Sequence, residues 1–212
     1  MRIIAGKWRS RQIAAPEGRT TRPILDRAKT VLFDILGHRL YEPGGLPPLA
    51  VLDLFAGSGT LGFEALSRGA RYCLFIEQDR VTASLLRKNL DLLNIVNEGL
   101  VIEGKASYCE YQPPPVLPDV PAQYELVFVD PPYSMLTGPL PHKDIRHLLH
   151  RLATESVIAR SALVVVRHRL QSAGEPDLTP LVEQESRDVG KMTFRFMVRP
   201  DFGLLPEGKE PE

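Results

Sequence analysis

The four residues Asp130-Pro131-Pro132-Tyr133 carry the most specific chemistry in this 212-residue chain. Asp130 is the last residue of a short apolar run, 125–130, which is typical of a buried strand, and the other three residues follow it. The Asp130 carboxylate and the Pro131 carbonyl oxygen can accept the two hydrogens of an exocyclic amine, which turns the nitrogen lone pair toward an electrophile. Tyr133 offers a ring on which a base can stack, and the prolines stiffen the turn without adding donors. The motif therefore predicts group transfer to the amine of a nucleobase.

A glycine-rich loop forms a second candidate site. The stretch from Asp53 to Gly62, DLFAGSGTLG, follows the apolar run 49–55 and precedes a segment compatible with a helix. Glycines at a helix N-terminus let the backbone approach a ligand closely. Glu77 ends the next apolar run, 20 residues after Gly57, where its carboxylate can accept hydrogen bonds from both hydroxyls of a ribose. The loop and the glutamate together predict a bound nucleoside cofactor.

Asp53 indicates which nucleoside cofactor fits this loop. A dinucleotide brings its pyrophosphate to the glycines, and a carboxylate at the strand end would repel the phosphates. S-adenosylmethionine has no phosphate and presents two cations, an ammonium and a sulfonium, which suit an aspartate. We therefore expect S-adenosylmethionine as the cofactor, S-adenosylhomocysteine as the product, and no metal.

Alternating apolar and amphipathic segments are expected to position these residues. Strands are predicted over 49–55, 72–77, 99–103, 125–130 and 162–167, and helices over 24–40, 61–68, 80–93 and 142–153. Such α/β alternation implies a parallel sheet with helices on both faces. The segments 183–189 and 192–199 alternate around Gly190 and predict an antiparallel hairpin that closes the sheet. The proline-rich stretch 112–123 is expected to be a surface loop in place of one crossover helix.

Composition and charge limit the classes of protein to which this chain can belong. With 43% hydrophobic and 25% charged residues, we expect one globular domain with a small appendage, not a disordered chain or a coiled coil. No apolar run approaches the roughly 18 residues of a membrane helix, so we expect a soluble cytoplasmic protein with no membrane partner. Residues 1–30 carry eight basic and two acidic side chains, a net charge of +6. This basic arm is either a solvated surface or a contact for nucleic-acid phosphates.

The cysteines and a histidine cluster have an ordinary interpretation. Cys73 and Cys109 are too few for a disulfide framework or a four-ligand zinc site, and we expect reduced structural thiols. His142, His147 and His150 could bind a metal, but a solvated, mildly basic helix face is favoured.

Several segments taken together resemble one known family. They are RIIAGKWRSR near the N-terminus, RPILDRAKTVLFDIL, DLFAGSGTLGFEALSRGA, the acid at Glu77, and DPPY. Over about residues 1–200 this set resembles the RsmD family of bacterial ribosomal RNA methyltransferases. That family methylates N2 of a guanine in 16S ribosomal RNA of the small subunit, and it has a Rossmann-like class I methyltransferase fold of seven strands with the last one antiparallel. DPPY alone would also admit DNA adenine-N6 methyltransferases, and the N-terminal segments favour the ribosomal RNA family.

The resemblance implies a division of the chain and a set of site residues. We expect a basic arm or short hairpin over 1–22, a methyltransferase domain over 23–200 and an acidic, flexible tail over 201–212. The implied cofactor contacts are Asp53, Phe55, Ala56, Gly57, Ser58, Gly59, Glu77, Gln78, Lys105 and Ala106, and the implied catalytic residues are Asp130, Pro131, Pro132 and Tyr133. The implied RNA contacts are Arg2, Lys7, Trp8, Arg9, Arg11, Arg22 and Arg27, where Trp8 either stacks on a base or pins the arm. We expect a monomer whose partner is ribosomal RNA or the small ribosomal subunit.

Three departures from the family pattern leave alternatives open. Lys105 stands where the family has an acidic residue for the adenine amino group, and a lysine cannot accept that hydrogen bond. Ile24 and Leu25 replace a threonine pair, and Ser10 replaces a glycine, a change to which we attach little weight. The alternatives are an adenine-N6 methyltransferase of DNA or RNA, or a catalytically inactive RNA-binding factor for ribosome assembly. A nicotinamide oxidoreductase fits the glycines but would leave Asp53 and the DPPY motif without a role.

Overall fold

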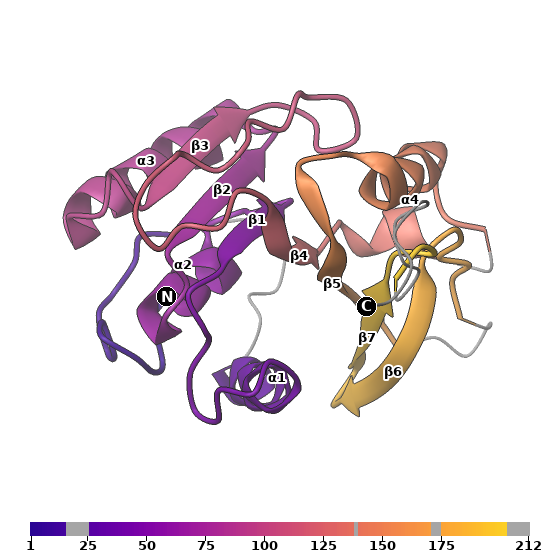
Figure 1. Cartoon of the computed structure of the whole chain (residues 1–212), viewed down its shortest axis with the longest axis horizontal. Helices are drawn as coiled ribbons and strands as arrows, with labels where there is room; N and C mark the ends of the chain where they lie inside the picture. The colour runs from indigo at the N-terminus through magenta and orange to yellow at the C-terminus, as the bar shows by residue number, and fades with distance from the viewer. Residues whose placement is uncertain (16–25, 138–139, 171–174, 203–212) are drawn as a thin grey trace, which may run out of the picture.

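A seven-stranded sheet forms the centre of the computed structural model, which describes residues 1–15, 26–137, 140–170 and 175–202. Its strands are β1 Ala50–Leu54, β2 Tyr72–Glu77, β3 Gly99–Glu103, β4 Tyr124–Val129, β5 Ile158–Arg169, β6 Val182–Val189 and β7 Met192–Val198. They follow the order β3-β2-β1-β4-β5-β7-β6 (Figure 1). β1 to β5 run parallel, and β7 is antiparallel to both β5 and β6. The predicted parallel sheet with an antiparallel hairpin at its end is confirmed.

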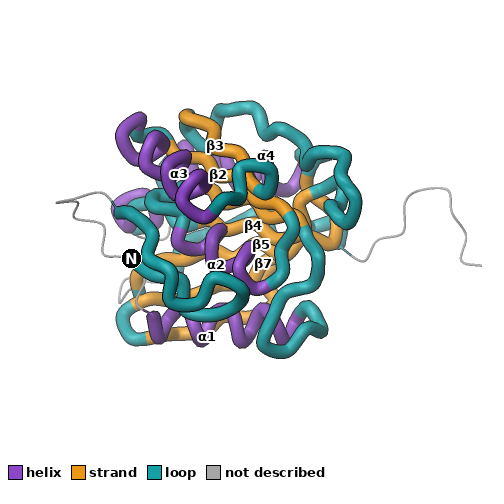
Figure 2. The backbone as a smooth tube through the Cα atoms, turned by 90° about the vertical axis from the view of Figure 1, so that its left-hand side faces the viewer, coloured by secondary structure: helices purple, strands orange, loops and turns teal. Residues whose placement is uncertain are grey.

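Helices cover both faces of this sheet, as predicted. In the described ranges they are α1 Asp26–Arg39, α2 Thr60–Arg68, α3 Arg80–Leu93, α4 Lys143–Thr154 and a short 3-10 helix, η1, Tyr133–Leu136. Apolar side chains of α1, α2 and α3 pack on one face, and those of α4 pack on the other. Figure 2 shows the strands inside, with helices and loops around them. The stretch 112–123 connects β3 to β4 as a loop, also as predicted.

The alternation of side chains along the strands decides which residues share a face. Val51 of β1 and Phe75 of β2 pack in the core between the sheet and α1, α2 and α3. Side chains two positions further along a strand point to the same face, so Asp53 and Glu77 lie on that face too. Both stand at or near the carboxyl ends of their strands, which is the edge where open α/β sheets bind ligands.

β5 extends beyond the predicted range, 162–167, at both ends. The exposed Arg160 and Ser161 interrupt its apolar pattern near the start, and the exposed Arg169 ends it. Where a strand carries outward-facing polar residues, hydrophobicity alone therefore underestimates its length.

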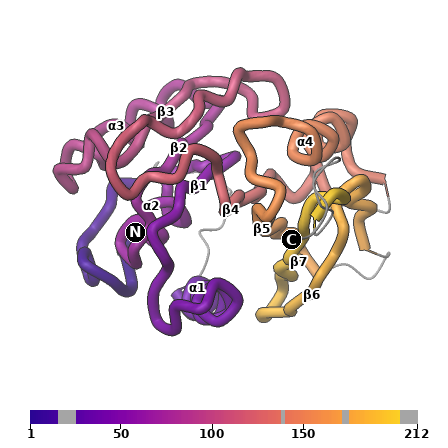
Figure 3. Tube along the Cα trace, viewed as in Figure 1, coloured from indigo at the N-terminus to yellow at the C-terminus, as the bar shows by residue number. Residues whose placement is uncertain are grey.

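The first 15 residues pack against α2. Arg2 and Gln12 form an antiparallel bridge, so this segment folds back on itself. The buried Glu64 of α2 accepts hydrogen bonds from the backbone N–H of Ile4 at 2.9 Å and of Ala5 at 3.0 Å. Figure 3 shows this indigo segment beside α2. The N-terminal segment is thus part of the folded body.

Ser10 lies in the turn of this N-terminal segment with a φ of 68°. This left-handed backbone strains a residue with a Cβ atom by on the order of 1 kcal/mol, and glycine adopts it freely. The replacement of glycine by Ser10, to which the sequence analysis gave little weight, therefore has a local cost. Residues 16–25, with Ile24 and Leu25, and residues 203–212 of the expected tail lie outside the described residues. Within the described ranges, no helix is long and apolar enough to cross a membrane.

Candidate active site

The loop between β1 and α2 has an unusual backbone. The φ angles of Phe55, Gly57 and Gly59 are 64°, 57° and 79°, all in the left-handed region. A Cβ atom on Gly59 would lie 2.5 Å from the Leu86 side chain and 2.5 Å from the Phe63 ring, so this position requires glycine. Phe55 has no such freedom and holds a strained conformation. Strain in a loop at a helix N-terminus is a sign of a ligand-binding site.

Asp53 is 2% exposed and lies under this loop. Its Oδ2 accepts a hydrogen bond from the backbone N–H of Gly62 at 3.0 Å, which ties β1 to α2. Burial, helped by the charges of Asp130 and Glu77 and opposed by the Gly62 hydrogen bond, raises the pKa of the Asp53 carboxyl to about 8. The carboxyl group is therefore mostly protonated at neutral pH, and a cation beside it would favour the charged form.

Glu77 connects the glycine loop to the start of α3. Its Oε2 accepts from the backbone N–H of Gly57 at 2.9 Å, and its Oε1 accepts from that of Asp79 at 2.8 Å. Each carboxylate oxygen has a second lone pair, so the side chain can still accept from two ribose hydroxyls. Gln78, the next residue, is exposed. The donor and acceptor set at this edge therefore fits S-adenosylmethionine.

The turn after β3 lies beside Glu77, because the backbone N–H of Gly104 donates to the Glu77 carbonyl at 3.0 Å. Lys105 is exposed, and its carbonyl oxygen accepts from Tyr108 and Cys109, both at 2.9 Å. Ala106 is buried. An adenine in this region would therefore be recognised by backbone groups or by stacking, since the lysine ammonium is a donor only.

The Asp130–Tyr133 motif leaves the end of β4, next to β1 in the sheet. Asp130 Oδ1 accepts a hydrogen bond from Nε of Arg167 at 2.6 Å. Burial raises the pKa of the Asp130 carboxyl, and Arg167 opposes that rise. Pro131 is buried, whereas Pro132 is exposed and precedes η1, which Tyr133 begins. The structure thus brings Asp53, Glu77 and this motif to one edge of the sheet.

Three of the expected RNA contacts are free to meet a partner. Arg9, Arg11 and Arg27 are exposed, and Arg22 lies outside the described residues. Arg9 and Arg11 lie in the N-terminal segment and Arg27 in α1, and exposed guanidinium groups suit a salt-dependent contact with phosphates.

The other expected RNA contacts interact within the protein. Arg2 forms an ion pair with Asp26 at 2.8 Å, and Lys7 forms one with Glu98 at 2.9 Å. Both pairs are exposed, so they contribute little and phosphates can compete for them. Trp8 packs in part against the core, and the Lys7 ammonium lies 4.2 Å from its ring centroid.

The histidines are spread along an exposed surface. His142 caps α4 by accepting from the backbone N–H of Asp144 at 3.3 Å, and His147 stacks on Tyr108 with ring centroids 5.1 Å apart. His150 is exposed. Among the described residues, no group of three or more His, Cys, Asp and Glu side chains could hold a metal ion.

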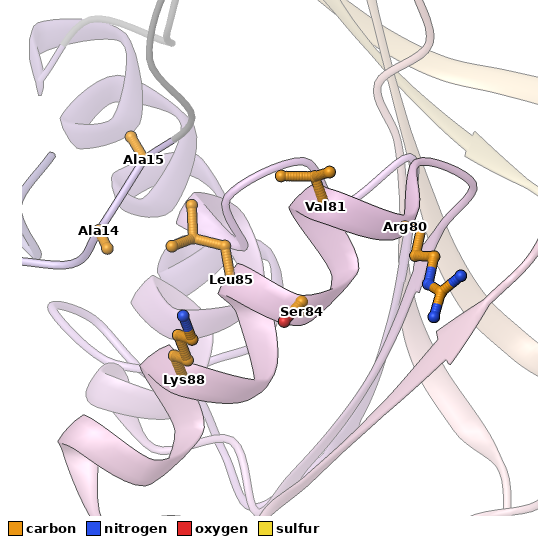
Figure 4. Close-up of a pocket in the computed structure, with 7 residues that line it drawn as sticks. All are labelled: Ala14, Ala15, Arg80, Val81, Ser84, Leu85 and Lys88. Atoms are coloured by element: carbon orange, nitrogen blue, oxygen red, sulfur yellow. The ribbon is translucent and has the colours of Figure 1, made fainter.

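An open pocket of about 610 Å³ lies between Ala14, Ala15 and the outer side of α3 (Figure 4). Arg80, Leu85 and Lys88 of α3 are among the residues that line it. None of the residues expected to contact the cofactor or the target amine lines this pocket.

Several buried polar residues were missed by the sequence analysis. Asn89 of α3 bonds to both backbone groups of Ala14, at 2.9 and 3.0 Å. Glu64 and Lys29, both at most 1% exposed, hold the N-terminal segment. A signal was present for Glu64, since a single acid inside the apolar run Leu61–Leu66 requires buried partners. Arg167 had no such signal.

Comparison with solved structures defines the class of fold. "Putative methyltransferase yhhF" from Escherichia coli matches with a TM-score of 0.71 and 29% identity, over 94% of this chain and 97% of that one. The rRNA methyltransferase aviRa from Streptomyces viridochromogenes matches with a TM-score of 0.61 and 18% identity, over 90% of each chain. This chain therefore has the Rossmann-like class I methyltransferase fold.

The family follows from the sequence comparisons. The family model described as "Conserved hypothetical protein 95" matches residues 1–198, and the chain belongs to that family. "Ribosomal RNA small subunit methyltransferase D" of Haemophilus influenzae is 38% identical over 133 residues, 63% of this chain and 64% of that protein. "Putative rRNA methyltransferase YlbH" of Bacillus subtilis is 30% identical over 168 residues, 79% of this chain and 82% of that protein. The matched region thus spans just under two thirds of the Haemophilus protein.

Proposed function

We propose that this protein transfers a methyl group from S-adenosylmethionine to the exocyclic N2 amine of a guanine in small-subunit (16S) ribosomal RNA. The observation that carries the proposal is the meeting of Asp53, Glu77 and the Asp130–Tyr133 motif at one edge of the sheet. The names of the relatives from Haemophilus influenzae and Bacillus subtilis support ribosomal RNA as the acceptor.

The chemistry assigned to the motif is the presentation of an amine. S-adenosylmethionine supplies an electrophilic methyl group on its sulfonium. The Asp130 carboxylate accepts one N–H of the target amine and the Pro131 carbonyl accepts the other, so the lone pair faces that methyl group. Pro132 fixes the turn, and Tyr133 offers its ring to the base. Direct attack would form the N–CH₃ bond as the S–CH₃ bond breaks, with S-adenosylhomocysteine as the leaving group and one amine proton lost to solvent. This route needs no covalent enzyme intermediate, and neither cysteine belongs to the motif.

The cofactor role is assigned to the loop and the two acids. Asp53 would face the ammonium, and Glu77 would accept hydrogen bonds from the ribose hydroxyls. The backbone of Phe55, Ala56 and Gly57 to Gly59 would hold the methionine portion, and Gln78, Lys105 and Ala106 would hold the adenine. The exposed arginines of the N-terminal segment supply sequence-independent affinity for phosphates, while the motif selects the base.

Glu77→Ala is expected to weaken S-adenosylmethionine binding by about 10- to 100-fold, because a charged acceptor of two hydrogen bonds is lost. Isothermal titration of the wild-type protein and the variant measures the difference. Glu103→Ala is the matched control, since this exposed glutamate is paired with Glu77 in the register of β2 and β3. Equal affinities of wild type and Glu77→Ala would contradict the cofactor assignment. Absence of binding to the folded wild-type protein, with RNA also present, would favour the inactive assembly factor.

The affinity for S-adenosylmethionine is expected to rise with pH. The pKa of Asp53 is raised to about 8 in the free protein, so binding of a cation beside this carboxyl releases a proton at lower pH. Between about pH 6 and pH 7.5 the affinity should rise by up to about tenfold per unit. Titration calorimetry in buffers of different ionisation enthalpy measures the proton release directly.

Two controls isolate Asp53 as the group that titrates. Asp53→Asn keeps an oxygen for the Gly62 N–H but cannot ionise, so its affinity should be flat over the same range. 5′-Methylthioadenosine lacks the ammonium and should bind the wild-type protein without the pH dependence. A slope that is the same in Asp53→Asn would assign the titration to another group.

The acceptor is tested by methyl transfer to naked 16S ribosomal RNA, small ribosomal subunits and double-stranded DNA, compared side by side. Digestion of the labelled product identifies the modified nucleoside, and N2-methylguanosine is the expected result. N6-methyladenosine would instead establish the adenine-N6 alternative, which the same motif admits.

A further inference from the structure

Arg167 of β5 contacts both ends of the Asp130–Tyr133 motif. Its Nε donates to Asp130 Oδ1 at 2.6 Å. The carbon of the same guanidinium lies 5.9 Å from the centroid of the Tyr133 ring. One side chain from a neighbouring strand therefore hydrogen-bonds the acid of the motif and lies within cation–π range of its aromatic ring.

The register of the sheet places Arg167 there. Val129 of β4 pairs with Val166 of β5 in parallel, and one further step along both strands sets Asp130 beside Arg167. Phe128 and Val165 both pack in the core under α1, α2 and α3. Since side chains two positions apart share a face, Asp130 and Arg167 point the same way, and the ion pair follows from the pairing of the strands.

A contribution to folding stability does not explain why the Arg167 guanidinium is buried at this position. The side chains of Arg167 and Asp130 are 10% and 17% exposed, and Nη1 of Arg167 is shielded from solvent without a hydrogen-bond partner in the described structure. Arg199, which is equally buried, uses Nη1 on the carbonyl oxygens of Glu155 and Ile158. A buried ion pair adds little net stability, and an unpaired buried donor opposes folding.

We propose that Arg167 is a positioning residue for methyl transfer: it holds Oδ1 of Asp130 and leaves Oδ2 to accept the N–H of the target amine. The inference rests on the proposed function. The charged or titratable groups that interact with Asp130 in the described structure are Arg167 on β5, Asp53 on β1 and, through Arg167, Tyr133 in η1. Only Arg167 is positive, so it is the group that favours the charged form of this buried carboxyl.

The test is the pH profile of kcat/KM for Arg167→Met and Arg167→Lys, measured with ribosomal RNA. Burial raises the pKa of Asp130 and Arg167 lowers it. In Arg167→Met, the midpoint at which kcat/KM falls on the acid side of the profile should therefore shift to higher pH by about one pH unit or more. Activity at pH 7 should fall by about tenfold or more and recover as the pH rises. Arg167→Lys keeps the positive charge, so its acid-side midpoint should lie closer to that of the wild-type protein. Arg167→Gln replaces Met if that variant does not fold.

Arg199→Met is the matched control, because Arg199 is as buried as Arg167 and forms an ion pair with Asp201. It should lower the melting temperature and leave the pH profile in place. A titration of the Asp130 carboxyl by NMR gives the same comparison without turnover. If the wild-type protein is active and the profile and the titration are unshifted in Arg167→Met, the inference is overturned while the proposed function stands. If the wild-type protein methylates no nucleic acid, the proposed function fails first, and the inference fails with it.

Discussion

Asp130→Ala is expected to lower kcat for methyl transfer by about 10³-fold or more. The substitution removes the carboxylate that accepts an N–H of the target amine, so the nitrogen lone pair is no longer directed. S-adenosylmethionine should still bind within about threefold of the wild-type affinity, because Asp53 and Glu77 are unchanged. Transfer of a labelled methyl group to ribosomal RNA at saturating cofactor measures kcat, and calorimetry measures binding.

Two further variants make this expectation specific. Asp130→Asn keeps one acceptor oxygen and should retain part of the activity, unlike alanine. Glu125→Ala removes a half-buried acid from the same strand, outside the motif, and should leave kcat within about threefold. Near-normal turnover by Asp130→Ala would remove the catalytic assignment, even if the cofactor site proved correct.

The parts of the candidate site that short sequence patterns determine could be predicted from the sequence. The apolar runs around 49–55 and 72–77 locate two strand ends, and the parallel arrangement brings Asp53 and Glu77 to the same edge. The DPPY motif follows the next strand in the sheet for the same reason. Arg167 could not be found this way, because its partner is 37 residues away and the contact depends on the register between two strands. The sequence contains no short-range signal for that register.

The N-terminal segment illustrates a second limit. Its net positive charge is visible in the sequence, but the sequence does not say which cations are already paired. Arg2 and Lys7 meet acids that follow them by 24 and 91 residues, whereas Arg9 and Arg11 stay exposed. Long-range ion pairs therefore decide how much of the charge is free for RNA.

Glu64→Leu is expected to lower the free energy of unfolding by about 3–5 kcal/mol. Glu64 is fully buried, and Nε of Arg68 donates to its Oε1 at 2.9 Å. The substitution would leave that buried guanidinium and the partly buried backbone N–H groups of Ile4 and Ala5 without their acceptor. Chemical denaturation measures the change, against Glu98→Leu as the control, because the exposed Lys7–Glu98 pair should contribute less than about 1 kcal/mol.

The same substitution separates the N-terminal segment from the cofactor site. Ile4 and Ala5 both depend on Glu64, so their amide hydrogens should exchange faster in Glu64→Leu, as the segment detaches from α2. RNA affinity should then fall and lose part of its salt dependence, since Arg9 and Arg11 no longer sit on a fixed surface. Binding of S-adenosylmethionine should persist in the folded fraction, because Asp53 and Glu77 take their places from β1 and β2. Equal losses of RNA and cofactor affinity would mean that the segment and the cofactor loop form one cooperative unit, and unchanged RNA affinity would assign RNA binding to another surface.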